Sequence, residues 1–325
     1  MSLSRLSTQA TLYSYNGGWI QEKLQERPSI DQDLPFSGCI LTWNIDFMAA
    51  LLRERFQAAL AHLESLLSPN CVSPPPPPTI VLIQEMHHTC FKVLLENQFV
   101  REFYHLSNIE APHTYSTITL VPRALAPLVS AVGRVPFGTA TRMKRDCLYV
   151  DLDVPYTRSH PAPGPAGAGS DTTPTLRVRM ANTHLESLDG VGEAMRQKQL
   201  EAISDLLKAD DVAGGLVAGD MNCIGVNDRD LPVRMGLVDA WLVAKGLASE
   251  PESSDTDSET GEAKGHTWGY QPRGRYPPRR MDKILTAGKL EAVDIQRVGV
   301  GLKVEGSGVW VSDHYGLLAR LVLRP

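Results

Sequence analysis

The chain has 325 residues, of which 42% are hydrophobic, and its formal net charge is -5 at pH 7. This length and composition are typical of a globular protein with a sizeable core, organised as one large domain or two small ones. The negative charge excludes a basic coat over the whole surface. Any binding of nucleic acid must therefore use a local basic patch.

The five cysteines lie far apart and show no CxxC or Cys/His spacing that would indicate zinc or a disulfide framework. This pattern favours a reducing intracellular compartment. The N-terminal segment contains no apolar core, and no window of the chain approaches the length of a membrane span. We therefore expect a soluble protein that is not secreted and has no membrane partner.

Residues 1–37 mix polar residues with Tyr13, Tyr15 and Trp19, and we expect an arm that docks on the domain without being part of its core. A single domain is expected over residues 38–325, because the polar motifs described below span nearly all of it. It begins with a strand at 37–43. An amphipathic helix is expected at 49–67, where apolar residues recur at helical spacing before Pro69.

A second helix is expected at 191–208, and further strands at 79–84, 115–121, 147–154, 176–182, 215–218, 283–285 and 316–322. Stretches rich in proline, in glycine and alanine, or in acidic residues and serine predict flexible inserts near 68–79, 155–175 and 249–264. Many strands with few helices between them predict an α/β fold. In it, two mainly antiparallel β-sheets pack face to face and helices lie outside.

Short polar motifs end or follow several of these apolar runs, where a sheet can gather distant residues into one site. Each motif alone is compatible with a turn or a cap. Together they predict a hydrolytic metal centre. The motifs carry Asn44 and Asp46, Glu85, His184, Asp220 and Asn222, Asp282, and Asp313 with His314.

Glu85 ends a buried apolar strand, where a carboxylate needs water, a cation or another partner. One carboxylate completed by waters and substrate oxygens is the usual way in which proteins bind Mg²⁺. Asn44 and Asp46 alternate on the first strand, so they can offer an amide to phosphate or water and a carboxylate to the same ion. We expect a Mg²⁺ site around these three residues.

Asp220 and Asn222 lie two residues apart after an apolar strand, so an extended chain would point both side chains the same way. A carboxylate beside an amide can orient a nucleophilic water. The same Gly-Asp-x-Asn sequence is also a good turn, and both interpretations stay open.

His184 and His314 are the histidines that follow apolar runs beside other polar motifs, and such residues are often structural. His314, however, follows Asp313, and Asp282 ends a further motif. A histidine held by an aspartate can stay protonated and stabilise charge that develops on a phosphoryl oxygen.

Two basic clusters flank these motifs, and they fit either a phosphate-binding face or ordinary solvated surface. Aromatic residues that could stack on a base lie near them in the sequence: Tyr115, Trp268 and Tyr276. The clusters contain Arg142, Lys144 and Arg145, and Arg273, Arg275, Arg279, Arg280 and Lys283.

Taken in order, the motifs Trp-Asn-Ile-Asp, Gln-Glu, Thr-His-Leu-Glu-Ser, Gly-Asp-x-Asn, Arg-x-Asp and Ser-Asp-His resemble the endonuclease/exonuclease/phosphatase superfamily from about residue 38 to 324. Within that superfamily, several segments are similar to the 5′-tyrosyl-DNA phosphodiesterases. These segments are Thr42–Asp46, Arg134–Phe137, Arg145–Leu148, His184–Ser187, Val238–Trp241, Thr267–Trp268 and Ser312–Leu317.

The resemblance implies a four-layered α/β sandwich and Mg²⁺-dependent hydrolysis of a phosphodiester, with Mn²⁺ as a second possible ion. It implies that Glu85 is the metal carboxylate, assisted by Asp46, and that Asp220 and Asn222 orient the attacking water. His314, paired with Asp282, would stabilise the transition state. The remaining site residues would be Asn44, His184 and Asp313 around the phosphate and metal, and Tyr115, Trp268, Arg280 and Arg145 as contacts to DNA.

The implied substrate is a DNA 5′ end that carries a tyrosyl adduct, hydrolysed to a 5′ phosphate during repair of topoisomerase adducts. The implied protein is a monomer in the nucleus, with the cytoplasm as a second location. Phe47-Met48 and Cys223–Val226 depart from the family pattern on the nucleic-acid side of the site, so the substrate stays open. The alternatives are an abasic endonuclease, a deadenylase, an inositol or lipid phosphatase, or a catalytically silent module that binds nucleic acid or a partner.

Overall fold

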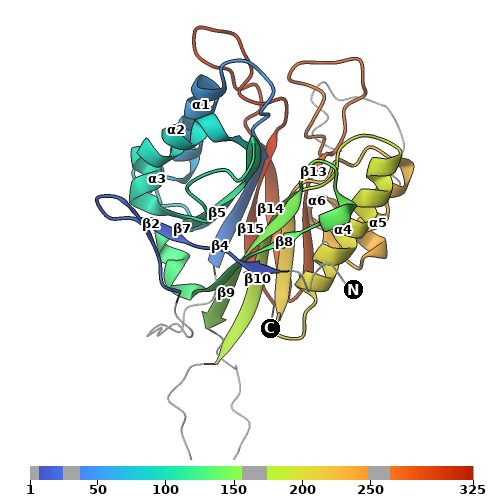
Figure 1. Ribbon diagram of the computed structural model, residues 1–325, viewed down its shortest axis with the longest axis horizontal. Helices are drawn as coiled ribbons and strands as arrows, with labels where there is room; N and C mark the ends of the chain where they lie inside the picture. Colours follow the sequence, from blue (N-terminus) through green and yellow to red (C-terminus); the bar gives the residue numbers. More distant parts are fainter. Residues whose placement is uncertain (1–6, 25–36, 156–173, 248–263, 325) are drawn as a thin grey trace, which may run out of the picture.

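Two β-sheets pack against each other in the computed structural model, with helices on their outer faces (Figure 1). The structure describes residues 7–24, 37–155, 174–247 and 264–324. The expected inserts near 155–175 and 249–264 therefore lie almost entirely outside the described residues.

The seven-stranded sheet combines the short N-terminal strand β1 with strands from the middle and the C-terminal part of the chain. Among its described strands, β10 and β11 form the only parallel pair, and the other pairs are antiparallel. The order of its strands is β1 (Thr8–Gln9), β8 (Val129–Pro136), β9 (Asp146–Pro155), β10 (Thr175–His184), β11 (Gly214–Asp220), β13 (Asp282–Gly288) and β12 (Val238–Asp239).

The eight-stranded sheet joins both ends of the chain. In the part of this sheet that the structure describes, the only parallel pair is β4 with β5. Its strand order is β14 (Leu290–Val298), β15 (Gly316–Leu323), β4 (Ser37–Asn44), β5 (Thr79–His87), β7 (Tyr115–Pro122), β6 (Tyr104–Leu106), β2 (Tyr13–Tyr15) and β3 (Trp19–Gln21). The prediction of two mainly antiparallel sheets is confirmed.

Helices complete a four-layered sandwich. Three of them, α1 (Leu52–Leu67), α2 (Phe91–Glu96) and α3 (Gln98–Phe103), cover the eight-stranded sheet, and Phe56, Leu60 and Leu63 of α1 are buried against it. On the other side, α4 (Val191–Leu207) and α5 (Leu231–Arg234) cover the seven-stranded sheet. The short helix α6 (Ala240–Ala244) places Trp241 in the core between the sheets.

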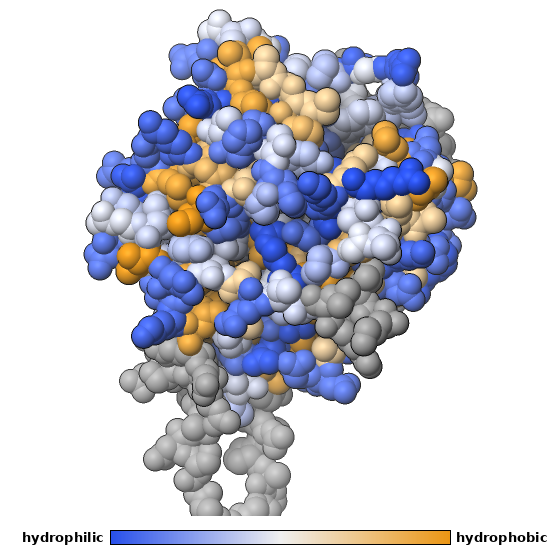
Figure 2. All heavy atoms as spheres, viewed as in Figure 1, coloured by the Kyte–Doolittle hydropathy of each residue, from blue (hydrophilic) through white to orange (hydrophobic). Residues whose placement is uncertain are grey.

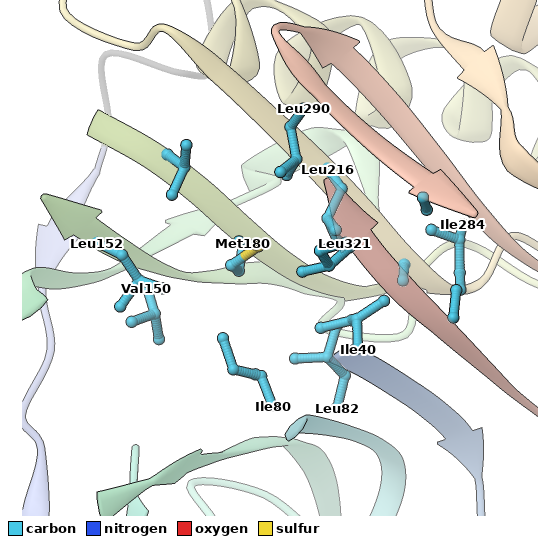
Figure 3. Close-up of a cluster of buried hydrophobic side chains, with 14 of the residues drawn as sticks. Ile40, Ile80, Leu82, Val150, Leu152, Met180, Leu216, Ile284, Leu290 and Leu321 are labelled. Atoms are coloured by element: carbon cyan, nitrogen blue, oxygen red, sulfur yellow. The ribbon is translucent and has the colours of Figure 1, made fainter. Parts of the chain in front are cut away.

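The central core consists mainly of aliphatic side chains that alternate along the facing strands, as two packed sheets require. Figure 3 shows Ile40, Ile80 and Leu82 of the eight-stranded sheet facing Val150 and Met180 of the other sheet. Because the apolar residues are used between the layers, most of the surface visible in Figure 2 is hydrophilic. Among the described helices, none is both long enough and apolar enough to cross a membrane.

The N-terminal arm belongs to the fold more closely than its sequence predicts. Its strand β1 pairs with β8 of one sheet, and β2 pairs with β6 of the other. Leu12, between them, is only 2% exposed and lies in the central core, so the expectation that the arm stays outside the core is wrong for this residue. Edge pairing of this kind leaves little periodic signal, because each strand has only two or three residues.

We expect Leu12→Ala to lower the free energy of unfolding by about 2–5 kcal/mol, because it removes buried methyl groups from a core that cannot fully collapse. Ile20→Ala on the same arm is the matched control, since Ile20 is 48% exposed. Urea denaturation followed by circular dichroism measures both. Equal, small effects of the two changes would show that the arm does not contribute to the core.

Candidate active site

The predicted polar residues meet where the two sheets come together, at the C-terminal ends of β4, β5, β10 and β11. Strand register explains part of this convergence: His184 lies opposite Asp220, and Asp220 lies opposite Asp282 on the next strand. Asn44 ends β4 in the other sheet, and its Nδ2 donates hydrogen bonds to Asp220 at 3.0 Å and to Glu85 at 3.2 Å. One amide thus ties the two sheets together at the site.

A β-bulge aims Glu85 at the site. The pairing of β5 with β7 shifts register between Ile83 and Met86, and Glu85 has a left-handed φ of 59°. Its Oε2 accepts a hydrogen bond from the backbone N–H of Phe47 at 2.8 Å. Bulges redirect side chains in this way near active sites.

Asn182, which was not predicted as a site residue, donates hydrogen bonds to carbonyl oxygens that lose their strand partners at the bulge. Its Nδ2 donates to the carbonyl oxygens of Ile118 at 2.9 Å and Ile83 at 3.3 Å, and its Oδ1 accepts from Gln84 at 2.8 Å. Both amide side chains are fully buried. The sequence did contain a signal, because Gln84 and Asn182 are polar residues in otherwise apolar strands. Buried amides of this kind need hydrogen-bond partners.

The backbone just before Asp220 packs closely against the neighbouring strand. Gly219, with φ +146°, precedes it, and any Cβ at that position would lie 1.9 Å from the carbonyl oxygen of Thr183. After Asp220 the chain turns, because Asp220 Oδ1 accepts from the backbone N–H of Asn222 at 2.9 Å and Asn222 has φ 47°. Of the two geometries that the sequence left open, the structure shows the turn.

The side chain of Asn222 serves the turn itself. Its Nδ2 donates to the carbonyl of Leu185 at 3.0 Å, which connects the loops that follow β10 and β11. Sequence spacing could not show this, because the partner is a backbone carbonyl far away in the chain.

His184 is held between Arg145 and Asp220. Arg145 Nη1 lies 2.5 Å from His184 Nδ1, and His184 Nε2 lies 3.2 Å from Asp220 Oδ2. A guanidinium only donates hydrogen bonds, so Nδ1 presents a lone pair and the ring proton is on Nε2, facing Asp220. Arg145 thereby selects the tautomer of His184.

His314 forms a buried ion pair with Asp282, because its Nδ1 lies 2.7 Å from Asp282 Oδ2. Burial opposes the charged imidazole, but the carboxylates of Asp282, Asp313 and Asp220 outweigh it and raise the pKa of His314 well above 6.5. Its Nε2 lies 3.9 Å from Asp220 and 3.8 Å from Asp313. A protonated imidazole thus faces the site.

The pKa values of two neighbouring carboxylates are shifted in opposite directions. Burial would raise the pKa of Asp220, but His184, His314 and the N–H of Asn222 lower it below its ordinary value, so this carboxylate stays ionised. Burial raises the pKa of Asp313 to about 6 despite His314 nearby, and Trp268 Nε1 donates to Asp313 Oδ2 at 2.9 Å.

Two groups of described side chains could hold a metal ion, with ligand atoms within 4.8 Å of one another: Glu85, His184 and Asp220, and Asp220, Asp282 and His314. In the first group the carboxylates of Glu85 and Asp220 suit a divalent cation, while both ring nitrogens of His184 are engaged by Arg145 and Asp220. In the second group, the ion pair with Asp282 already occupies His314 Nδ1.

Two predicted site residues have other partners. Asp46 has φ 54° and pairs with the buried Arg55 at 3.1 Å, so it lies outside both of these groups. Arg280 is only 6% exposed and donates to Asp239 at 2.7 Å, so it forms a buried ion pair, and its expected contact with DNA stays a prediction. A buried arginine and an exposed one look alike in sequence.

The aromatic and basic residues near the site separate into two places. Tyr115 stacks on Phe47 with ring centroids 4.0 Å apart, and Arg145 lies 5.1 Å from the centre of the Tyr115 ring. Trp268 lies beside His314 through a β-bridge. Tyr115, Arg145 and Trp268 therefore border the ionisable cluster from different sides.

Fold and cluster together define a phosphoesterase-type hydrolase. Residues 41–314 match the model of the Endonuclease/Exonuclease/phosphatase family, and the chain belongs to that family. Enzymes of this family usually use a divalent metal ion.

Among solved structures, TDP2 enzymes share the fold. TDP2 from Caenorhabditis elegans has a TM-score of 0.62 and 19% identity over 90% of this chain and 77% of that chain. A humanized D. rerio TDP2 has a TM-score of 0.61 and 18% identity over 88% of this chain and 98% of that chain. The human Nocturnin catalytic domain has a TM-score of 0.54 and 16% identity over 90% and 96%. No curated protein sequence matches this chain significantly.

We expect Asn182→Ala to lower the free energy of unfolding by about 1–3 kcal/mol, because two buried carbonyls lose their donor. It should also weaken the binding of Mn²⁺, since the bulge that aims Glu85 would lose the support of Asn182. Asn227→Ala is the control, because Asn227 is exposed in a short 3-10 helix that follows β11. Urea denaturation and calorimetric Mn²⁺ titration test both effects, and unchanged Mn²⁺ affinity would contradict the proposed link to Glu85.

We expect His314 to remain protonated at neutral pH and Asp282→Asn to lower its pKa. The raised pKa of His314 stabilises the native state. This contribution is complete below the ordinary histidine pKa and is lost as the pH rises through the raised native value. Imidazole ¹⁵N chemical shifts followed against pH measure it. Titration of wild-type His314 near 6.5 would contradict the expectation.

Proposed function

We propose that the protein is a Mg²⁺-dependent phosphodiesterase that hydrolyses 5′-phosphotyrosyl DNA and leaves a 5′ phosphate. One observation carries the proposal: Asp220 has Glu85 and His184 on one side and the protonated His314 on the other. A phosphodiester in this position would meet a cation site on one side and an N–H donor on the other.

Each residue has a role in the proposed reaction. Asp220, ionised because of its neighbours, orients the attacking water and accepts its proton. His314 donates from Nε2 to a phosphoryl oxygen as negative charge develops, while Asp282 holds its Nδ1. Asn44 keeps Glu85 and Asp220 in register, since it donates to both.

The cation belongs at Glu85 in this proposal. When bound, Mg²⁺ would supply Lewis-acid polarisation of the phosphoryl group, with Mn²⁺ as a substitute. His184 then positions Asp220, because Arg145 directs the ring proton toward that carboxylate.

Support for DNA as the substrate comes from a structural neighbour. A D. rerio TDP2 crystallised with a single-strand DNA product shares the fold, with a TM-score of 0.59 and 18% identity over 88% of this chain. The family-like motifs around Arg145 and His314 favour the same substrate. We propose a role in repair of topoisomerase–DNA adducts by a monomer in the nucleus, and also in the cytoplasm.

The test is release of tyrosine from a 5′-phosphotyrosyl oligonucleotide, followed by gel electrophoresis with and without Mg²⁺. We expect Asp220→Asn and His314→Gln each to lower kcat by about 10³-fold or more, as removal of a catalytic donor or base does. Asp230→Asn is the control, since Asp230 is exposed on a separate loop. Cleavage of an abasic-site or inositol phosphate substrate, with no tyrosine release, would sink the proposal.

A further inference from the structure

Arg55 is a buried cation that the proposed reaction does not use. It lies in the first turn of α1 and is only 1% exposed. Its Nε donates to the carbonyl of Trp310 at 3.0 Å, its Nη1 to the carbonyl of Asp46 at 2.8 Å, and its Nη2 to the carbonyl of Ile45 at 2.9 Å. A buried charge is costly even when it is paired, so stability alone is a weak reason for this arginine.

The guanidinium fixes the loop that follows β4. Asp46, at the start of this loop, has a left-handed φ of 54°, which is uncommon for a residue other than glycine. Arg55 binds the carbonyl oxygen of each peptide group that flanks Asp46, and its Nη2 also donates to Asp46 Oδ2 at 3.1 Å. The orientation of both peptide groups therefore depends on Arg55.

The N–H groups of the same two peptides point at the site. In a planar trans peptide the C=O and N–H point in opposite directions, so a held carbonyl also aims the N–H. The N–H of Asp46 donates to Asn44 Oδ1 at 2.9 Å, and the N–H of Phe47 donates to Glu85 Oε2 at 2.8 Å. With its oxygen held in this way, the Asn44 amide turns its Nδ2 to Glu85 Oε1 at 3.2 Å. Both carboxylate oxygens of Glu85 are thus held by donors whose direction Arg55 sets.

Arg55 also reaches the loop that carries His314. Trp310, which accepts from Arg55 Nε, lies two residues before Ser312. Ser312 Oγ donates to the carbonyl of Asn44 at 2.6 Å and accepts from the N–H of His314 at 3.0 Å. One guanidinium therefore connects the loop beside Glu85 with the loop that presents the imidazole.

We propose that Arg55 is a positioning residue, which orients Glu85 for a divalent cation through the two peptide groups that flank Asp46. Asp46 then supports the cation site through Arg55 and its own backbone, and it is not a ligand, in keeping with its place outside both groups of converging ligand atoms. The inference rests on the proposed function for the cation at Glu85. Arg55 acts through Glu85 and takes no part in the chemical step.

The decisive variant is Arg55→Met, which removes the guanidinium but keeps an unbranched side chain for the buried space. Loss of a positive charge near a cation site would by itself tighten the binding of Mn²⁺. We expect the opposite, a loss of about 10-fold in affinity, as removal of a group that orients a metal ligand produces. Calorimetric titration of Mn²⁺ into the folded protein measures it without substrate. Affinity equal to that of the wild type, or higher, would overturn the inference.

Arg179→Met is the matched control. Arg179 is also a buried arginine, which pairs with Asp151 at 2.6 Å and donates to the carbonyl of Leu206 at 2.8 Å. It lies on β10, five residues before His184. Both variants should lower the midpoint of urea denaturation, but only Arg55→Met should weaken Mn²⁺ binding. Equal losses of affinity in the two variants would reveal a general effect of destabilisation and refute a positioning role.

Arg55→Lys takes the place of Arg55→Met where the latter does not fold. Lysine keeps the charge but concentrates it on one nitrogen, which cannot replace three separate nitrogen atoms of a planar group. We expect weaker Mn²⁺ binding than in the wild type, and in that case unchanged binding would refute the role of the guanidinium.

Asp46→Asn tests whether Asp46 is a ligand. If Asp46 acts through Arg55, this change should weaken Mn²⁺ binding in the wild type but alter it by less than about 2-fold in Arg55→Met. An equal loss in both proteins would make Asp46 a ligand and contradict the inference. Because no substrate is used, absence of tyrosine release by a protein that binds Mn²⁺ would refute the proposed function alone, whereas a wild type that binds no Mn²⁺ would refute both.

Discussion

The hydrogen bonds that Asn44 donates to Asp220 and Glu85 hold the site together, because they join the two sheets where their strands end. Each sheet alone supplies only part of the chemistry: Glu85 comes from one sheet, and His184, Asp220 and Asp282 from the other. Asn182 and Gln84 make a second amide contact between the sheets just beneath the site. A buried amide that lacks its hydrogen-bond partner destabilises the protein. These contacts therefore favour the one alignment of the sheets in which the amides find their partners.

The electrostatic balance of the site follows from this alignment. Asp220, Asp282 and Asp313 surround His314, and their combined charge keeps the imidazole protonated despite its burial. The same histidine and His184 keep Asp220 ionised, while burial, with the nearby carboxylates of Asp46 and Glu85, raises the pKa of Asp313 to about 6. A protonated histidine and an ionised aspartate therefore lie a few ångströms apart, because the surroundings of each group, and not its residue type alone, set its pKa.

The sequence predicted the sandwich class, both long helices and the convergence of six polar motifs. Alternating apolar runs carry that information locally, and the family resemblance adds the order of the motifs. It did not predict the strands of the arm, the bulge at Glu85 or the partner of Arg280. Short edge strands have almost no periodicity, a bulge is a property of two paired strands, and an ion pair such as Arg280 with Asp239 joins residues 41 positions apart.

By itself, the sequence determined which residue types stand at the strand ends, since burial of apolar runs forces polar residues to their tips. Only the tertiary structure decided what those residues do. Asp46 is turned to Arg55, Asn222 closes a turn onto Leu185, and Phe47 places its ring on Tyr115. Each of these outcomes depends on the distance and direction between side chains of separate elements, which sheet packing sets and which no local pattern encodes.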